Sequence, residues 1–219
     1  MTTRPNLHVS IDLETLSTSP AAVILSIGAI AFCEDTGRTA HFATVVSIDS
    51  QDDRQTDAST LTWWQQQSAE ARIVLDLARE PDTPTLRQAL DLFTDWIGTF
   101  GATHDVHVWG NGSDFDVAIL AHAYKSFTPF VPWNFRKARD MRTLYDITAR
   151  FGLNIKAYTP RVGTHHNALD DAQYQANIIH ESLRQIGLIA RFIRDEQPDL
   201  WQAYLARESQ PQLAQEASA

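Results

Sequence analysis

The chain has 219 residues, of which 43% are hydrophobic, and its formal net charge is −9. This length suits one α/β domain with additional elements at the edge of its sheet or, at most, a small second domain. The acidic balance argues against broad nucleic-acid binding through bulk positive charge. The single cysteine, Cys33, excludes an internal disulfide and fits a reducing compartment. We find no run of 18 apolar residues and no signal-peptide pattern, so we expect a cytoplasmic protein that does not enter a membrane.

The N-terminal part of the chain predicts three β-strands in succession. Residues 7–13 and 23–33 are apolar and rich in β-branched side chains, as buried strands are. A third strand is predicted at 41–48, after a turn at Gly37 and Arg38. Because no helix intervenes, we expect an antiparallel meander rather than a β-α-β unit.

Helices and shorter strands alternate in the remainder of the chain. We expect helices near 56–64, 69–79, 85–100, 113–127, 141–152, 167–186 and 199–206, and strands at 105–110 and 134–140. A meander followed by strand–helix units predicts an α/β fold in which helices flank a mixed sheet. We assign residues 1–205 to one domain and residues 206–219, which are poor in hydrophobic side chains, to a flexible tail.

Asp12 and Glu14 stand one residue apart at the end of the first predicted strand. Side chains at i and i+2 of a strand point to the same face, so the two carboxylates project together. Two like charges side by side repel, and a divalent cation would hold them there because hard cations prefer carboxylate oxygens. The alternative is a strand end with solvated acids, which is the commoner meaning of an isolated D-x-E motif.

A second acidic position lies in the segment WGNGSDFDVAIL. Asp116 falls in the first turn of a predicted helix, whereas Asp114 stands just before it and could cap it. The helix dipole favours acids at a helix N-terminus, so both aspartates could also serve only the helix start. The residues alone leave these alternatives open.

A third acidic position lies in the segment THHNALDDAQ. Asn167 can cap the predicted helix, and Asp170 lies at its third position, where it can accept hydrogen bonds from free N–H groups. Asp171 points about 100° further round, beside the apolar stripe of the helix. An aspartate there is costly unless it is paired or binds a metal ion. Either His165 or His166 lies within a turn of this site, although a histidine before a helix is more often structural.

Four acids on three separate elements, accompanied by a histidine, match the needs of two-metal phosphodiester hydrolysis. The acids are Asp12, Glu14, Asp116 and Asp171. Two cations about 4 Å apart stabilise both the attacking and the leaving oxygen in such reactions. Hard carboxylates suit Mg²⁺ or Mn²⁺, and a histidine can take a proton from the attacking water near neutral pH.

These motifs resemble those of the DEDD exonuclease superfamily, histidine subclass (DEDDh), which has an RNase H-like fold. DLET is similar to the first motif, NGSDFDVAIL to the second and HNALDD to the third, and the resemblance runs from about residue 7 to residue 190. It selects Asp116, His166 and Asp171 over their neighbours. The stretches IDLETLSTSPAAVILSIGAIAF, LTWWQQQS and RDMRTLYD further resemble the ribonuclease AS-like subgroup, which includes phage exodeoxyribonuclease A.

The resemblance implies a 3′→5′ exonuclease that acts on the 3′ ends of RNA or single-stranded DNA and forms a homodimer. RNA is favoured because ribonuclease AS is the more similar of the two. The resemblance also implies that Asp12 bridges two metal ions, that the other three acids complete their coordination and that His166 activates the water. The product would be a nucleoside 5′-monophosphate.

Leu13, Thr15 and Trp64 are our candidates for contacts with the substrate. Thr15 follows the carboxylates of the first motif, so the resemblance implies a position near the terminal nucleotide. Trp63 and Trp64 follow the third strand, where an exposed indole can stack on a base. We expect at least one of the two indoles to lie in the core.

The densest basic stretch of this acidic chain is NFRKARDMR. It contains Arg136, Lys137, Arg139 and Arg142. These cations could follow a nucleic-acid backbone. A solvated face, a dimer contact or pairing of Arg142 with Asp140 fits the sequence about as well.

Two further functions fit the same residues. One is a phosphohydrolase that acts on dinucleotides or nucleotide caps, and the other is a nucleic-acid-binding module with a degenerate site. The intact carboxylates argue against the module, because decayed sites usually lose an acid. Rates on dinucleotides and on oligonucleotides would separate the phosphohydrolase from an exonuclease.

Overall fold

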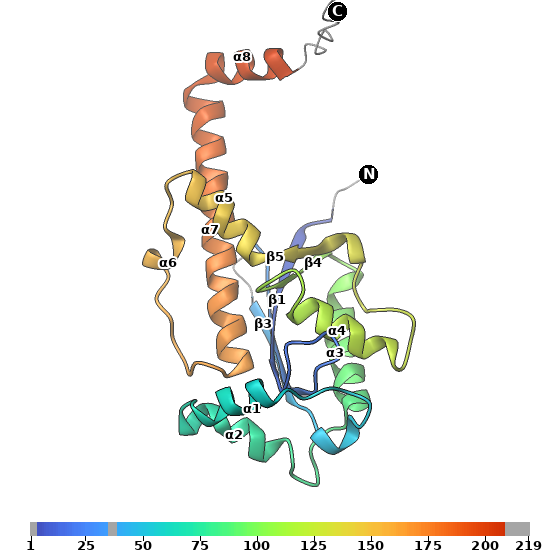
Figure 1. Cartoon of the computed structure of the whole chain (residues 1–219). Coiled ribbons are helices and arrows are strands. Elements are labelled where there is room, and N and C mark those ends of the chain that lie inside the picture. Colours follow the sequence, from blue (N-terminus) through green and yellow to red (C-terminus); the bar gives the residue numbers. More distant parts are fainter. Residues whose placement is uncertain (1–3, 35–38, 209–219) are drawn as a thin grey trace, which may run out of the picture.

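The computed structural model describes residues 4–34 and 39–208, which form a five-stranded mixed sheet flanked by helices (Figure 1). The strands are β1 (Asn6–Thr15), β2 (Ile24–Phe32), β3 (Thr39–Val45), β4 (Asp105–Gly110) and β5 (Ala138–Asp140). Their order is β3-β2-β1-β4-β5, with the first three antiparallel and with β4 and β5 added in parallel. The predicted mixed sheet that begins with a meander is confirmed. The turn predicted at Gly37 and Arg38 lies outside the described residues.

The helices lie close to the predicted positions. They are α1 (Ala58–Gln65), α2 (Ala69–Leu77), α3 (Leu86–Gly101), α4 (Asp116–Lys125), α5 (Met141–Arg150), α6 (Ile155–Tyr158), α7 (Ala168–Glu196) and α8 (Pro198–Glu208), together with the 3₁₀ turns η1 (Ile48–Ser50) and η2 (Phe135–Lys137). None of the helices formed by the described residues is long and apolar enough to cross a membrane.

Three differences from the prediction concern the helices, and two concern the strands: β3 ends at Val45 rather than at residue 48, and β5 begins at Ala138 because Phe135–Lys137 form the turn η2. The short helix α6 interrupts a segment expected to be loop, and α7 continues beyond residue 186 to Glu196. α7 continues because no proline follows before Pro198, and Gly187 inside it costs only about 1 kcal/mol. The third difference among the helices is that α8 extends to Glu208, so residues 206–208 are helical rather than part of a tail. The rest of the predicted tail, 209–219, is outside the described residues.

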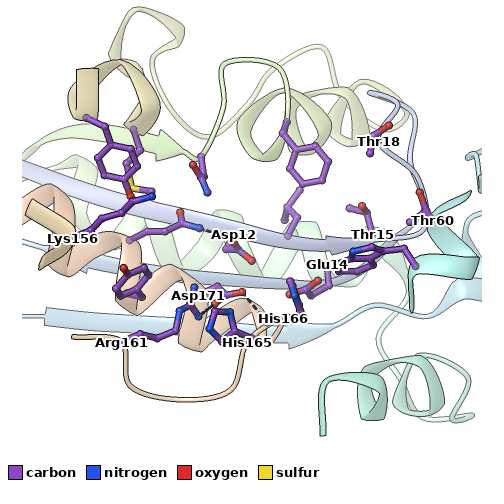
Figure 2. Close-up of a pocket in the computed structure, with 18 of the residues that line it drawn as sticks. Asp12, Glu14, Thr15, Thr18, Thr60, Lys156, Arg161, His165, His166 and Asp171 are labelled. Carbon is purple, nitrogen blue, oxygen red and sulfur yellow. Dashed lines mark hydrogen bonds and ion pairs between the residues drawn. The ribbon is translucent and has the colours of Figure 1, made fainter. Parts of the chain in front are cut away.

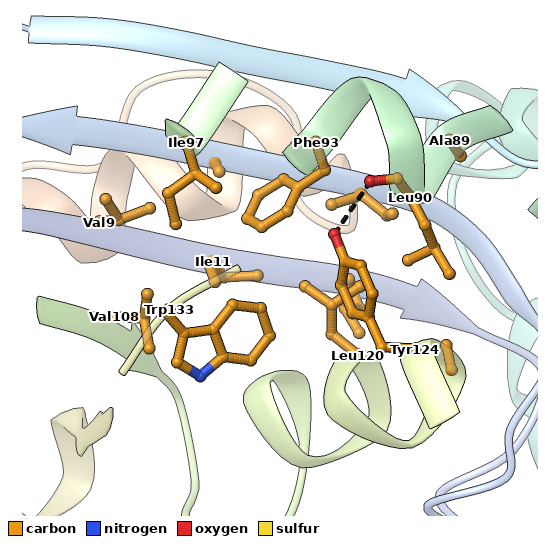
Figure 3. Close-up of a cluster of buried hydrophobic side chains, with 14 of the residues drawn as sticks. Val9, Ile11, Ala89, Leu90, Phe93, Ile97, Val108, Leu120, Tyr124 and Trp133 are labelled. Carbon is orange, nitrogen blue, oxygen red and sulfur yellow. Dashed lines mark hydrogen bonds between the residues drawn. The ribbon is translucent and has the colours of Figure 1, made fainter. Parts of the chain in front are cut away.

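The two faces of β1 meet different layers of helices. Val9 and Ile11 point toward α3 and α4 and lie in the largest apolar core (Figure 3). Tyr124 of α4 joins that core, and its hydroxyl donates to the carbonyl oxygen of Leu90 in α3 at 2.9 Å. Because side chains alternate along a strand, the even-numbered residues of β1 face the other layer, which contains α7.

α7 approaches the sheet closely because its contact residues, and one position in β2, are small. Ala172 and Ala176 pack into the apolar cluster between α7 and the sheet. Gly28 of β2 has no side chain, and a Cβ added there would lie 2.2 Å from the backbone carbonyl carbon of Ala168. Since Gly28 pairs in register with Asp12, the N-terminus of α7 comes to lie beside the middle of β1.

Candidate active site

Asp12 and Glu14 project from β1, the central strand, into a pocket beside the start of α7 (Figure 2). Gln175 of α7 donates its side-chain amide to Asp12 Oδ1 at 2.5 Å and accepts a hydrogen bond from the Ser10 hydroxyl at 3.5 Å. Glu14 is 6% exposed. The two carboxylates are therefore held on a rigid element, and one of them is oriented by a helix that arrives from the far end of the sequence.

Asp116 begins α4 and lies next to the end of β1. Its Oδ1 accepts the backbone N–H of Leu13 at 3.1 Å, and its Oδ2 accepts the N–H of Asn111 at 2.8 Å. The side chain is 2% exposed, whereas Asp114 is exposed to solvent. The structure thus places Asp116, and not Asp114, against the strand that carries the first two acids.

Asp171 lies in the first turn of α7 and holds the loop that precedes it. Its Oδ2 accepts the backbone N–H of His166 at 3.0 Å, and its Oδ1 accepts a hydrogen bond from the Arg161 guanidinium. The neighbouring Asp170 accepts the backbone N–H of Thr164 at 2.7 Å. Both acids of α7 therefore hold the preceding loop, but only Asp171 also lines the pocket.

The loop before α7 is built from unusual backbone conformations. His166 has a φ of 62° and Gly163 a φ of 94°. A non-glycine residue in this left-handed region costs about 1 kcal/mol or more, so the hydrogen bonds to the first turn of α7 must outweigh that cost. Asn167 caps α7 as predicted, because its Oδ1 accepts the N–H groups of Leu169 and Asp170, each at 3.2 Å.

Glu14, His166 and Asp171 form a group that can hold a metal ion. One ligand atom from each lies within 4.8 Å of the other two. Asp12 and Asp116 lie beside this group, since Asp116 repels Glu14 and Asp12 is itself repelled by Glu14 and Asp171. The carboxylate oxygens suit a hard divalent cation, whereas an imidazole nitrogen suits softer ions such as Zn²⁺, so the acids rather than His166 are the ligands expected for a hard cation.

Burial and crowding raise the pKa values of three acids at this site, Asp12, Glu14 and Asp116. Burial raises the pKa of Glu14 to about 8, assisted by the negative charges of Asp171 and Asp116. Burial also raises the pKa of Asp116, to about 6, against the effect of the two backbone N–H donors. The pKa of Asp12 is raised well above its usual value by burial and then by the charges of Asp116, Glu14 and Asp171. Without cations, the folded protein favours protonated carboxyls here.

We expect the metal-free protein to lose stability as pH rises. Between about pH 4.5, the ordinary pKa of Glu14, and about pH 8, the folded state holds a proton at this carboxyl that the unfolded chain has released. The free energy of unfolding therefore falls with pH, by up to about 1.4 kcal/mol per pH unit for each such carboxyl. Thermal unfolding in a chelator from pH 5.5 to 8.5 measures this trend. Glu14→Gln should flatten it, and a melting temperature that rises steadily with pH would contradict it.

The pocket measures about 660 Å³ and has two chemically distinct ends (Figure 2). Glu14, Thr15, Thr18 and Thr60 lie toward one end, and Lys156 lies at the other. Leu13 and Thr15, both predicted to contact substrate, line the pocket. The Thr15 hydroxyl donates to the carbonyl oxygen of Ser17 at 2.8 Å, which leaves its oxygen available only as an acceptor.

The two tryptophans have different roles, and our choice of Trp64 as the substrate contact is wrong. Trp64 is 1% exposed and donates its indole N–H to the carbonyl oxygen of Thr15 at 2.9 Å, so it supports β1 from the core. Trp63 is 39% exposed, lines the pocket and packs edge-on against the His166 ring at 4.7 Å between centroids. The expectation that one indole is buried is confirmed. Consecutive helical residues point about 100° apart, so only one can face the site.

The four cations of the basic stretch NFRKARDMR do not line the pocket. Lys137 forms an ion pair with Asp105 at 2.5 Å, and the Arg139 guanidinium donates to backbone carbonyl oxygens nearby. Asp140 caps α5 by accepting the backbone N–H of Arg142, so the suggested Arg142–Asp140 contact is a helix cap and not an ion pair. Arg136, the fourth cation, is exposed. The cations that do line the pocket are Lys156 and Arg161, from the segment expected to be a plain loop.

Sequence reasoning also missed Gln175 and the two tyrosines of the pocket wall. Gln175 follows Asp171 by four residues and therefore shares its helix face, a signal that was available in the sequence. Tyr145 and Tyr174 each lie under a cation: Lys156 Nζ is 4.6 Å from the first ring centroid, and the Arg161 guanidinium is 4.4 Å from the second. No local pattern marks these pairs, because their partners come from different elements.

A family model described as the 3′-5′ exoribonuclease Rv2179c-like domain matches residues 7–183, which include all five predicted metal and catalytic positions. The chain belongs to this family. The family is one of 3′-5′ exonucleases, in agreement with the motifs and with the acidic pocket of this Rv2179c-like domain. A search of curated proteins found no match.

Solved structures of nucleases share the fold of this Rv2179c-like domain. One is described as cell-death related nuclease 4 (CRN-4), with a TM-score of 0.60 and 15% identity over 82% of this chain and 64% of that one. Another is described as a full-length 3′-exonuclease, with a TM-score of 0.58 and 15% identity over 84% of this chain and 63% of that one. The chain thus spans slightly less than two thirds of each, and at this identity the likeness concerns the fold alone.

Proposed function

We propose that this protein is a metal-dependent 3′→5′ exonuclease of the DEDDh type that removes nucleoside 5′-monophosphates from single-stranded RNA. The observation that carries the proposal is one open pocket in which Asp12 and Glu14 of β1 meet Asp171 of α7 beside His165 and His166. The fourth acid, Asp116 of α4, is buried next to this pocket and accepts the backbone N–H of Leu13, which lines it. Membership of a family described as exoribonucleases supports the same activity and favours RNA over single-stranded DNA.

The carboxylates of Asp12, Glu14, Asp116 and Asp171 would hold two Mg²⁺ or Mn²⁺ ions. These ions supply positive charge where negative charge grows on the oxygens of the reacting phosphate. The protein prepares the site in advance, because backbone N–H groups orient Asp116 and Asp171 and a side-chain amide orients Asp12. Little reorganisation is then needed when substrate binds.

His166 is suited to take a proton from the attacking water. Partial burial lowers the pKa of this imidazole, more than the nearby Asp171 carboxylate raises it, so the ring is neutral and able to accept a proton near pH 7. The water oxygen bonds to phosphorus while the bond from phosphorus to the 3′ oxygen of the preceding nucleotide breaks. That 3′ oxygen takes up a proton from solvent, and the phosphate stays bonded to the 5′ oxygen of the released nucleotide.

The experiment that tests this function follows the release of labelled mononucleotide from 3′-labelled single-stranded RNA with Mg²⁺ or Mn²⁺. Matched single-stranded DNA tests the sugar preference, and an RNA with a 3′-phosphate tests the need for a free 3′ end. Immediate release of 5′-monophosphates supports the proposal. Turnover of dinucleotides but not of oligonucleotides would indicate the phosphohydrolase instead, and metal-independent binding without turnover would indicate a binding module.

Trp63→Ala is expected to weaken substrate binding without unfolding the protein. The exposed Trp63 indole stands beside His166 at the pocket, where a terminal base can stack on it for roughly 1–3 kcal/mol, or about 5- to 150-fold in affinity. Fluorescence anisotropy with labelled RNA and thermal unfolding measure the two effects. Trp64→Phe is the matched control and should show the reverse pattern, a loss of stability with little loss of affinity once folded. Equal effects of the two substitutions would contradict this division of roles.

We also propose that the protein forms a homodimer through its C-terminal arm, which consists of the last turns of α7 together with α8 and stands away from the sheet (Figure 1). Leu188, Phe192 and Leu200 on this arm are 41%, 59% and 61% exposed. The adjacent Arg194 and Asp195 form an ion pair with each other on the arm, so the apolar residues are the surface that an antiparallel second copy would cover. Light scattering measures the molecular mass of the purified protein in solution, which distinguishes a homodimer from a monomer.

A further inference from the structure

Arg161 stands out as a cation bound inside an acidic pocket. Its guanidinium contacts Asp171 Oδ1 and lies over the Tyr174 ring, 4.4 Å from the centroid. The Arg161 side chain is 23% exposed and that of Asp171 is 10% exposed, so this ion pair is partly shielded from water. The other pocket-lining cation, Lys156, has no ion pair to a carboxylate among the described residues.

The contact engages an oxygen that a metal ion would also use. Asp171 Oδ2 already accepts the backbone N–H of His166, and the guanidinium occupies Oδ1. Asp171 belongs to the group that can hold a cation together with Glu14 and His166. A divalent cation bound there and the guanidinium of Arg161 therefore compete for the same carboxylate.

The guanidinium can leave without unfolding the loop. The backbone of the loop is fastened separately, by Thr164 to Asp170 and by His166 to Asp171. Arg161 itself contributes only its side chain to the ion pair, and the side chain is long and flexible. After release it still lines the pocket, where a planar guanidinium matches two oxygens of a phosphate.

We propose that Arg161 is an exchangeable counter-ion: it neutralises Asp171 in the metal-free protein and binds a backbone phosphate of the RNA once divalent cations hold Asp171. The inference rests on the proposed nuclease function, because it assigns a role to this residue within that site. It makes Arg161 both a competitor of the metal ion and a substrate-binding residue. Removing the Arg161 guanidinium should therefore raise the affinity for the metal ion and lower the affinity for RNA.

The test compares wild type, Arg161→Met and Arg161→Lys, with Lys156→Met as the matched control. Mn²⁺ affinity is measured by calorimetry without nucleic acid, and RNA affinity by anisotropy in Ca²⁺ with a phosphorothioate oligonucleotide that resists hydrolysis. Arg161→Met should bind Mn²⁺ about tenfold more tightly and RNA about tenfold more weakly, each change corresponding to one charge-assisted contact. For Arg161→Met, the plot of log RNA-binding constant against log salt concentration should be shallower by about 0.7. This is the slope expected for one phosphate contact on a single strand.

The controls separate this proposal from a structural role and from the function itself. Arg161→Lys should retain most of the RNA affinity, and Lys156→Met should leave Mn²⁺ affinity unchanged. Unchanged Mn²⁺ affinity in Arg161→Met would overturn the counter-ion role, and unchanged RNA affinity would overturn the phosphate contact. If wild type binds no divalent cation, the proposed function fails. If wild type binds Mn²⁺ and degrades RNA while Arg161→Met alters neither affinity, only this inference fails.

Discussion

Asp12→Asn should abolish exonuclease activity and at the same time stabilise the metal-free protein. Asp12 experiences repulsion from Asp116, Glu14 and Asp171 in addition to the cost of burial. Asparagine keeps an oxygen that can accept the hydrogen bond from Gln175 but carries no charge. Removing the charge should raise the free energy of unfolding in a chelator at pH 8 by about 1–3 kcal/mol.

Asp12→Asn should lose activity because the substitution also removes the negative charge with which Asp12 would bind a metal ion. A metal ligand that stabilises the transition state by several kcal/mol accounts for a factor of about 10³ or more in rate. RNA hydrolysis and chemical unfolding, each with and without Mn²⁺, measure both effects. Wild type should be stabilised by Mn²⁺ far more than the variant. Asp114→Asn, at an exposed neighbour of the site, is the control and should change neither quantity. Activity within tenfold of wild type in Asp12→Asn would show that the site is wrongly assigned.

Gly28→Ala is expected to damage the site without touching any of its side chains. An added Cβ would lie 2.2 Å from backbone atoms of Ala168, at the N-terminus of α7. Backbone cannot give way as a flexible side chain does, so the start of the helix must move or the sheet must distort. We expect a loss of about 2–4 kcal/mol in stability, as for other overpacked core positions.

The displacement caused by Gly28→Ala should also reduce catalysis. Asp171 lies within the first turn of α7, and a misplacement of about 1 Å can cost about 100-fold in rate. Thermal unfolding and kcat measured below the unfolding transition report the two effects. The matched control is Gly98→Ala, since Gly98 lies within α3 with no atom near an added Cβ. That change should stabilise the protein by up to about 1 kcal/mol. A fully active and stable Gly28→Ala protein would contradict the close approach of α7 to β2.

Much of the fold and three of the acids could be predicted from local signals, whereas the choice of Asp116 over Asp114 rested on the family resemblance. Alternation along β1 requires Asp12 and Glu14 to share a face whatever surrounds them. Helix periodicity and the cap at Asn167 likewise depend on neighbours only a few residues away, and both appear in the structure. The choice of Asp171 over Asp170 also follows from local geometry, because adjacent helical residues face different directions.

The two tryptophans and the pocket cations could not be assigned in this way. Trp63 and Trp64 are adjacent residues of the same type, so the local sequence does not distinguish them. The packing of α1 against the end of β1 decides which indole is buried. Arg161 and Lys156 lie in a segment without periodicity, so their places depend on where Tyr174 and Tyr145 stand on other helices. Contacts between distant parts of a chain leave no trace in the local pattern.

Short stretches of the chain thus specify the residue types of the candidate site and the elements on which they lie. How these residues meet depends on contacts between distant parts of the chain. The glycine at position 28 lets α7 reach the sheet, Asp116 is drawn to the end of β1 by the backbone of Leu13, and an arginine pairs with Asp171. The physical reason is that four like charges repel one another, so their convergence requires buried packing and hydrogen bonds from parts of the chain that are far apart in sequence.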